Sequence, residues 1–426
     1  MDSYNGLDTV NYINQLTVYR DLLNDDVLQA MLAFINSINK NNAQPQYGQL
    51  FFILSTAMEN DDHYVNDGWQ NHLLNLIIMA NNPFTRQAAT YGVNISPSLR
   101  NAAIQDLRFL QSLFNLNAQK ICKNLINIPL WDNLYHVGKL SKQNFSASNT
   151  ASALINAADW GDCVDLLINH YHRAGVGIFG RFHTLLWDGE KQNVIGVNNP
   201  DPIKLSDLIG YDWERKQIVD NTEAFIKGYP ANNVLLYGDR GTGKSSTVKA
   251  LVNSYGTDGL RLIEVPKQYL ADFPVIIRLL STLHQYFILF VDDLSFEDFE
   301  VEYKALKAVL EGGVETKPKN VLIYATSNRR HLIRESHSER QQDDVHAGDT
   351  MQEKLSLSDR FGLTVTFISP NQQQYLAIVE GLATGRGLNI PKEELHRQAI
   401  QWELRHSGRS GRVARQFVDY LEGTLK

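Results

Sequence analysis

A glycine-rich run in the second half of the chain has the pattern of a phosphate-binding loop. Residues Gly238-Asp239-Arg240-Gly241-Thr242-Gly243-Lys244-Ser245 match G-x-x-x-x-G-K-[ST], and Ser246 continues the run into an expected helix. Glycines here let backbone N–H groups close around phosphate oxygens at a helix N-terminus, where the helix dipole favours an anion. Lys244 would then neutralise the β and γ phosphates, and Ser245 would ligate Mg²⁺.

The flanking residues argue against a chance glycine-rich turn. The apolar stretch 233–237 before the run reads as a buried strand, and residues 246–252 after it read as a helix. A strand followed by a helix is the context that the motif requires. The sequence therefore predicts a site for a nucleoside triphosphate and its magnesium ion.

An acidic pair follows another apolar run. Residues 286–291 read as a strand that ends in Asp292 and Asp293. Such a pair usually begins a solvated loop, but beside a phosphate loop the first acid can meet Mg²⁺. Asp292 is the predicted metal-side acid and Asp293 the candidate for polarising an attacking water, with Glu297 as the less favoured alternative.

A polar amide follows a third apolar run. Residues 320–326 read as a strand leading into Ser327 and Asn328. Parallel strands end at one edge of a sheet, so Asn328 is expected near the acids. Its alternative role is to cap the next helix.

The elements that position these residues differ between the halves of the chain. From residue 10 to about residue 172, apolar residues recur with the helical period, which predicts an all-helical domain. A hairpin or linker is expected over 179–203, around the turn dipeptide Asp188-Gly189. Beyond it, short strands, including 260–265, alternate with helices, which predicts a parallel sheet.

Composition limits the classes of protein to consider. The chain has 426 residues, 43% hydrophobic and 20% charged, which fits two or three globular domains. No segment approaches the roughly 20 apolar residues of a membrane span, and no secretory signal is recognised, so a cytoplasmic location is expected. The net charge of −7 gives no general attraction to nucleic acid, although a local basic face stays possible. Cys122 and Cys163 lack metal-ligand spacing, so neither zinc nor a disulfide is expected.

With the phosphate loop, the acid pair and the amide in this order, the chain from 204 to 426 resembles AAA+ ATPases. The resemblance implies that Asn328 is the sensor 1 residue that positions the lytic water, and that the segment Leu208-Ile209-Gly210-Tyr211 holds adenine. It implies that Arg360 is an arginine finger that reaches the γ-phosphate of a neighbouring subunit. Arg412 would be the sensor 2 residue, with Arg415 as a close competitor. Read without the family, Arg360 is a surface ion-pair partner and Arg412 a helix cap.

More narrowly, the chain resembles an uncharacterised bacterial AAA+ family, a domain-of-unknown-function group. The stretches that carry this resemblance are 260–266, 304–314 and 324–331. The fold class that follows is an α/β P-loop NTPase with a parallel sheet and a C-terminal helical lid, preceded by an all-helical domain. The expected domains are 1–178, a helical domain suited to binding a partner, 179–203, the hairpin, 204–369, the nucleotide-binding domain, and 370–426, the lid.

The chain departs from common AAA+ patterns at two places. Asp292-Asp293 stands where many members have Asp-Glu, and the shorter side chain is expected to slow hydrolysis. Residues 266–271 lack the glycine of a threading pore loop, which disfavours an unfolding motor. His337, Asp343, Asp344 and His346 have no fixed ligand spacing, so a surface loop is expected there rather than a metal site.

The leading hypothesis is a homo-oligomeric ATPase that uses ATP and Mg²⁺ to change its oligomer or the contacts with an unknown protein partner. An ATP-gated nucleic-acid loader and a slow nucleotide switch are the alternatives. GTP is disfavoured because no Asn-Lys-x-Asp guanine motif is found.

Overall fold

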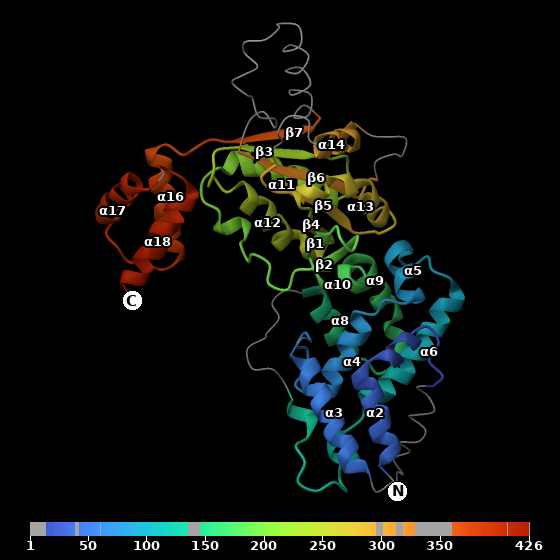
Figure 1. The fold of residues 1–426 in the computed structure, drawn as a ribbon. Coiled ribbons are helices and arrows are strands. Elements are labelled where there is room, and N and C mark those ends of the chain that lie inside the picture. Colours follow the sequence, from blue (N-terminus) through green and yellow to red (C-terminus); the bar gives the residue numbers. More distant parts are fainter. Residues whose placement is uncertain are drawn as a thin grey trace. The chain divides into compact units, whose positions relative to one another are not determined.

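The computed structural model describes residues 14–38, 42–59, 61–134, 145–294, 301–311, 318–328, 360–406 and 408–425. The chain divides into two compact units, Met1–Arg181 and Phe182–Lys426, hereafter unit 1 and unit 2 (Figure 1). None of the described helices is long and apolar enough to cross a membrane.

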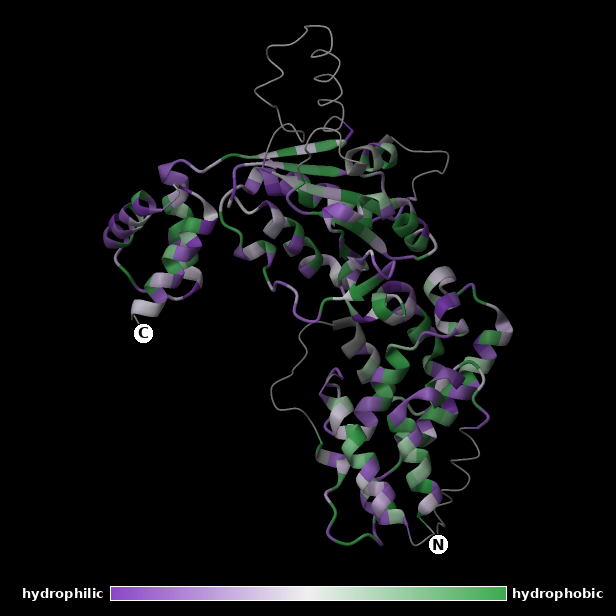
Figure 2. Cartoon of the chain, in the orientation of Figure 1, coloured by the Kyte–Doolittle hydropathy of each residue, from purple (hydrophilic) through white to green (hydrophobic). Residues whose placement is uncertain are grey.

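Every regular element in the described part of unit 1 is a helix, as the apolar periodicity predicted. The elements are η1 (Arg20–Asn24), α2 (Asp26–Ser37), α3 (Ala43–Met58), α4 (Gly68–Ile78), α5 (Pro83–Tyr91), α6 (Pro97–Phe114), α7 (Ala118–Ile121), η2 (Trp131–Asn133), α8 (Phe145–Asn156), η3 (Trp160–Cys163), α9 (Val164–Ala174) and α10 (Gly177–Arg181). Their buried apolar residues form one hydrophobic core, and Figure 2 shows apolar positions along these helices. The side chains of Trp69, Trp131 and Trp160 are almost completely buried.

Short polar side chains begin several of these helices. Asp25 accepts a hydrogen bond from the backbone N–H of Leu28 at the start of α2. At the start of α5, Asn82 and Thr85 form a reciprocal capping box ahead of a proline in the first turn. These bonds satisfy N–H groups that have no partner inside the helix.

Unit 2 is built on a seven-stranded sheet with the order β2-β1-β4-β5-β6-β3-β7. Its strands are β1 (Thr184–Asp188), β2 (Asn193–Gly196), β3 (Val234–Gly238), β4 (Leu260–Glu264), β5 (Tyr286–Val291), β6 (Val321–Ser327) and β7 (Leu363–Phe367). Only the β1–β2 hairpin is antiparallel, and the other neighbouring strands run parallel. The parallel sheet was predicted, whereas β7 was not. The hairpin expected over 179–203 is the end of this sheet, because β1 pairs with β4.

Helices cover both faces of the sheet (Figure 1). On one face, α11 (Asp212–Ile226) and α12 (Lys244–Tyr255) pack on alternate residues of the strands, such as Leu236, Phe290 and Tyr324. The intervening residues, such as Leu289 and Ile323, are equally buried, and α13 (Phe273–Leu280) and α14 (Val301–Glu311) lie on their side. Burial on both faces explains why the strands read as continuous apolar runs. The 3₁₀ turns η4 (Leu205–Asp207), η5 (Gly256–Asp258) and η6 (Lys267–Asp272) connect these elements.

A small helical lid follows β7. It consists of α16 (Gln372–Gly385), α17 (Lys392–Arg405) and α18 (Gly411–Leu425), which share a core of their own. Ile209, from the segment before α11, packs against this core. The lid therefore contacts the part of the chain that the sequence assigned to base binding.

Candidate functional site

The phosphate-binding loop connects the end of β3 to the start of α12. Gly238, Gly241 and Gly243 all have positive φ angles, of 134°, 76° and 92°. A Cβ on Gly238 would lie 2.0 Å from the carbonyl oxygen of Phe367 on β7. These glycines are thus required by the backbone path itself, as the motif implied.

Lys244 lies inside this loop and is only 6% exposed. Its Nζ donates to the carbonyl oxygens of Gly238 and Asp239, at 2.8 and 2.7 Å, and to Oδ1 of Asn328 at 3.2 Å. Burial lowers the pKa of Lys244, and the nearby carboxylates, that of Asp239 first, oppose the shift. The ammonium is held by neutral oxygens that a phosphate could replace.

The side chain of Asp239 holds the loop to the connection between β7 and the lid. Its Oδ2 accepts the backbone N–H of Ser369 at 2.7 Å, and hydrogen bonds from the side chain and then the backbone of Ser369 lower the pKa of Asp239. The backbone N–H of Asp239 donates to the carbonyl of Phe367 at 2.9 Å. At the start of α18, the backbone N–H of Arg412 donates to the carbonyl of Gly241 at 3.1 Å.

The acidic pair meets the loop at the carboxyl ends of β5 and β6. Oδ1 of Asp292 accepts the hydroxyl of Ser245 at 2.6 Å and that of Thr326 at 2.5 Å. Asp293 has a left-handed backbone, with φ 51°, and its Oδ1 accepts the Asn328 amide at 2.5 Å. The predicted metal-side acid, water-side acid and sensor amide therefore lie in one connected network.

The donor set of this network suits Mg²⁺. Ser245 and Asp292 offer a hydroxyl and a carboxylate, and Mg²⁺ in nucleotide sites is commonly held by such oxygens together with substrate phosphates and waters. The described residues contain no cluster of three or more His, Cys, Asp or Glu that would indicate an all-protein metal cage. A metal that arrives with a nucleotide fits better than a permanently bound one.

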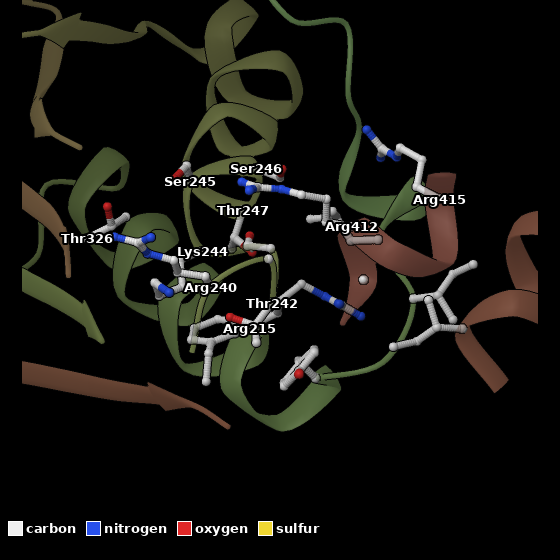
Figure 3. Close-up of a pocket in the computed structure, with 18 of the residues that line it drawn as sticks. Arg215, Arg240, Thr242, Lys244, Ser245, Ser246, Thr247, Thr326, Arg412 and Arg415 are labelled. Atoms are coloured by element: carbon white, nitrogen blue, oxygen red, sulfur yellow. The ribbon is translucent and has the colours of Figure 1, made fainter. Parts of the chain in front are cut away.

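These groups open into a pocket of about 570 Å³ in unit 2 (Figure 3). It is lined by Asp207, Leu208, Ile209, Tyr211, Arg215, Arg240, Gly241, Thr242, Gly243, Lys244, Ser245, Ser246, Thr247, Asp292, Asp293, Thr326, Asn328, Phe367, Ile378, Leu382, Gly411, Arg412 and Arg415. The volume lies within the range typical of small-molecule sites.

One end of the pocket is apolar and combines the segment 207–211 with the lid. Leu208, Ile209, Ile378 and Leu382 line it, and Ile209 packs against the core of the lid that includes Ile378. Gly381 of α16 leaves room for Ile209, since a Cβ there would lie 2.5 Å from the Ile209 side chain. Apolar walls of this kind can hold a flat base.

The other end is rich in cations. Arg240 of the loop and Arg412 and Arg415 of the lid line it, and Figure 3 shows the last two on α18. No side-chain hydrogen bond or ion pair joins these arginines to any residue in the described part of the chain. Unneutralised guanidinium groups beside the loop favour a polyanionic ligand.

Most of the predicted site residues meet here, but Arg360 does not. It precedes the amino end of β7, whereas Phe367, at the carboxyl end, pairs with Gly238 of the phosphate loop. Arg360 therefore lies near the amino ends of the parallel strands, whereas the pocket lies at their carboxyl ends. Gly238, Asp239 and Gly210 shape the backbone around the pocket without lining it.

Several predictions fall on residues outside the described part of the chain. They concern Glu297, the alternative base, and the surface loop with His337, Asp343, Asp344 and His346.

Sequence reasoning missed Thr326 and Arg215. Thr326 lies two residues before Asn328 at the end of a strand, and this spacing places both side chains on the same face. This two-residue spacing could have identified Thr326 as a neighbour of Asn328 from the sequence. Arg215 bonds to the carbonyl of Gly210 and to Asp212, and nothing in its local sequence distinguishes it from a solvated helical arginine.

Comparisons with known proteins give one family and several partial likenesses. The family described as "Protein of unknown function (DUF815)" matches residues 180–425. The replication factor C large subunit of Staphylothermus marinus is 40% identical over 58 residues, which is 13% of this chain and 14% of that protein. Among solved structures, the RuvB Holliday junction branch migration motor of Thermotoga maritima is 17% identical, with a TM-score of 0.36. The match covers 53% of this chain and 65% of that chain. A variant of the same RuvB has a TM-score of 0.38.

Proposed function

We propose that the second unit of this chain, which belongs to the DUF815 family, is an ATPase of the AAA+ type that binds ATP with Mg²⁺ and hydrolyses it. The observation that carries the proposal is the network at the carboxyl edge of the sheet. There Lys244 bonds to Asn328, Asn328 to Asp293, and Ser245 to Asp292. This is the constellation that phosphoryl transfer to water requires.

Each member of the network has a separate part in the reaction. The loop N–H groups and Lys244 hold the β and γ phosphates, and Ser245 and Asp292 hold Mg²⁺. When bound, Mg²⁺ neutralises charge that develops on the phosphate oxygens. Asn328 orients Asp293, whose second oxygen has no partner among the described residues and can accept a proton from the attacking water.

Arginines from two sources complete the site in this proposal. Arg412 of the lid lines the pocket and is suited to contact the phosphates within the same chain, with Arg415 beside it. Arg360 lies at the amino ends of the parallel strands, away from its own pocket, and in this proposal it acts on the nucleotide of a neighbouring subunit. ATP hydrolysis then requires a homo-oligomer.

The lid provides the coupling between nucleotide state and the contacts with a partner protein. The phosphate loop contacts the connection into the lid through Ser369 and the start of α18 through the backbone of Arg412. In this proposal, a loop that closes around phosphate moves these contacts or is moved by them. Such a coupling would support remodelling of an oligomer or of a partner protein.

A slow nucleotide switch is the second candidate. It is favoured by Asp293, whose short side chain is held by Asn328 in a left-handed backbone. In that case the bound nucleotide state, rather than the rate of turnover, is the output.

The proposal is tested by measuring ATP affinity and phosphate release on the same preparations of two variants. Lys244→Ala loses the buried cation of the loop and should lose most of its ATP affinity. Asp293→Asn should bind Mg²⁺ and ATP as the wild type does but release phosphate roughly 10²- to 10⁴-fold more slowly, since an amide cannot accept the proton.

The exposed residues Lys191 and Asp258 provide matched controls, because Lys191→Ala and Asp258→Asn make the same chemical changes away from the pocket. Wild-type ATP affinity in Lys244→Ala would remove the loop from the proposal. Undiminished turnover in Asp293→Asn would transfer the role of the base to Glu297.

A further inference from the structure

The hydroxyl of Thr326 lies between the acids of the proposed ATPase site. It donates to Oδ1 of Asp292 at 2.5 Å and accepts the backbone N–H of Asp293 at 2.9 Å. The residue is 2% exposed, at the end of β6. We propose that Thr326 is a positioning residue, which fixes Asp292 toward the metal and Asp293 toward the water. This proposal rests on the proposed ATPase function.

The direction of both hydrogen bonds follows from the atoms involved. The Asp293 N–H can only donate, so it uses a lone pair of the Thr326 oxygen, and the single hydroxyl hydrogen is left for the Asp292 carboxylate. Thr326 thus donates its hydroxyl hydrogen to Asp292 and accepts the backbone N–H of Asp293. A side chain of the same shape without a hydroxyl can do neither.

The contact with Asp293 holds a strained backbone. A left-handed φ of 51° is unfavourable for a residue with a Cβ, although Asp tolerates it better than most. The turn is held from β6 on both sides, because the N–H of Leu294 also donates to the carbonyl of Thr326 at 2.7 Å. Without the hydroxyl, the N–H of Asp293 keeps only a longer contact of 3.2 Å to Asp292.

The contact with Asp292 orients the metal-side acid. Oδ1 of Asp292 accepts hydroxyls from both Ser245 and Thr326, and Ser245 would in addition offer an oxygen lone pair to Mg²⁺. Thr326 does not ligate in this scheme, so its hydrogen bond can persist and keep the carboxylate in place. Partners of metal ligands typically contribute 10- to 100-fold to metal affinity.

A purely structural role makes the opposite prediction. If Thr326 only fills space at the end of β6, then Val, which keeps both branches, should be tolerated. Ser, which loses the methyl group, should be the worse replacement. If the hydroxyl positions the acids, Ser should rescue and Val should not.

The test compares Thr326→Val and Thr326→Ser with the wild type. Thr364→Val, at an exposed position of β7, is the matched control. The measurements are ATP affinity in EDTA, ATP affinity in Mg²⁺, and phosphate release over a Mg²⁺ titration. Thr326→Val should need roughly 10- to 100-fold more Mg²⁺ for half-maximal turnover. Its ATP affinity in EDTA should be unchanged, and Thr326→Ser and Thr364→Val should match the wild type.

An unchanged Mg²⁺ requirement in Thr326→Val, or a Ser variant as impaired as the Val variant, would overturn the positioning role. Thr326→Ala removes the same hydroxyl without a branched side chain and gives the same reading should the Val variant not fold. A wild-type protein that binds no ATP would instead refute the proposed function, so the two failures are distinguishable.

Discussion

Asp106 in unit 1 and Lys244 in unit 2 are both buried, but their partners differ. The carboxylate of Asp106 accepts the backbone N–H groups of Thr17, Val18 and Tyr19 at 2.8–3.1 Å, all within one helical unit. Lys244 bonds only to exchangeable neutral oxygens and opens onto a pocket with unpaired arginines. Polar groups that satisfy one another build a fold, whereas those left open to a pocket are available for a ligand.

The comparison predicts opposite responses to substitution. Asp106→Ala should leave three consecutive N–H groups, those of buried Val18 and Tyr19 and that of Thr17 beside them, without their acceptor, at about 1 kcal/mol or more for each. The free energy of unfolding should fall by about 3 kcal/mol or more, with ATP affinity at native conditions unchanged. Urea unfolding combined with ATP titration measures both.

Asp162→Ala, at an exposed position of unit 1, is the matched control and should change neither quantity. Lys244→Ala should show the reverse pattern, with lost ATP affinity and little lost stability. The comparison fails if Asp106→Ala unfolds like the wild type or if Lys244→Ala is the less stable of the two.

A smaller effect is expected from His72, which is 5% exposed and bonds to two carboxylates. Its Nδ1 lies 2.6 Å from Asp61 and its Nε2 3.1 Å from Asp25. Burial alone would lower the pKa of His72, but the hydrogen bonds that its ring donates to Asp25 and Asp61 outweigh burial and raise the pKa to about 9.

Because the folded pKa is above the unfolded value of about 6.5, protonation of His72 stabilises the fold fully below pH ~6.5. This stabilisation, at most about 3 kcal/mol, is lost as the pH rises through about 9. The free energy of unfolding of the wild type, measured with urea, should fall between pH 7 and 10. That of His72→Gln should not show this fall. If the free energy of unfolding depends on pH in the same way in both proteins, protonation of His72 does not stabilise the fold.

Local patterns predicted the parts of unit 2 that depend on local chemistry. The strand 286–291 was predicted with its bounds, and the ends of β3, β5 and β6 meet as parallel strands must. The glycines of the phosphate loop were predicted from the motif, and their positive φ angles agree with it.

What the sequence did not predict depends on contacts between distant residues. Strand β7 was missed because Leu363–Phe367 is a short run whose role is set by pairing with β3. The hydrogen bond between Ser369 and Asp239 joins residues 130 positions apart in the sequence. The contact of Ile209 with Gly381 joins the segment before α11 to helix α16 of the lid. No window of the sequence contains these pairs.

The central claim, that ATP is hydrolysed at a site shared between subunits, is tested most directly by mixing two inactive variants. Arg360→Ala should bind ATP but hydrolyse it roughly 10³- to 10⁵-fold more slowly, because an arginine finger acts on the transition state. Mixed with Lys244→Ala, which keeps Arg360, it should regain turnover at interfaces where one subunit holds the nucleotide and the other supplies Arg360. Mixing with the double variant that lacks both residues should restore nothing. Near wild-type turnover of Arg360→Ala alone, or an active wild type that stays monomeric with ATP, would contradict the shared site.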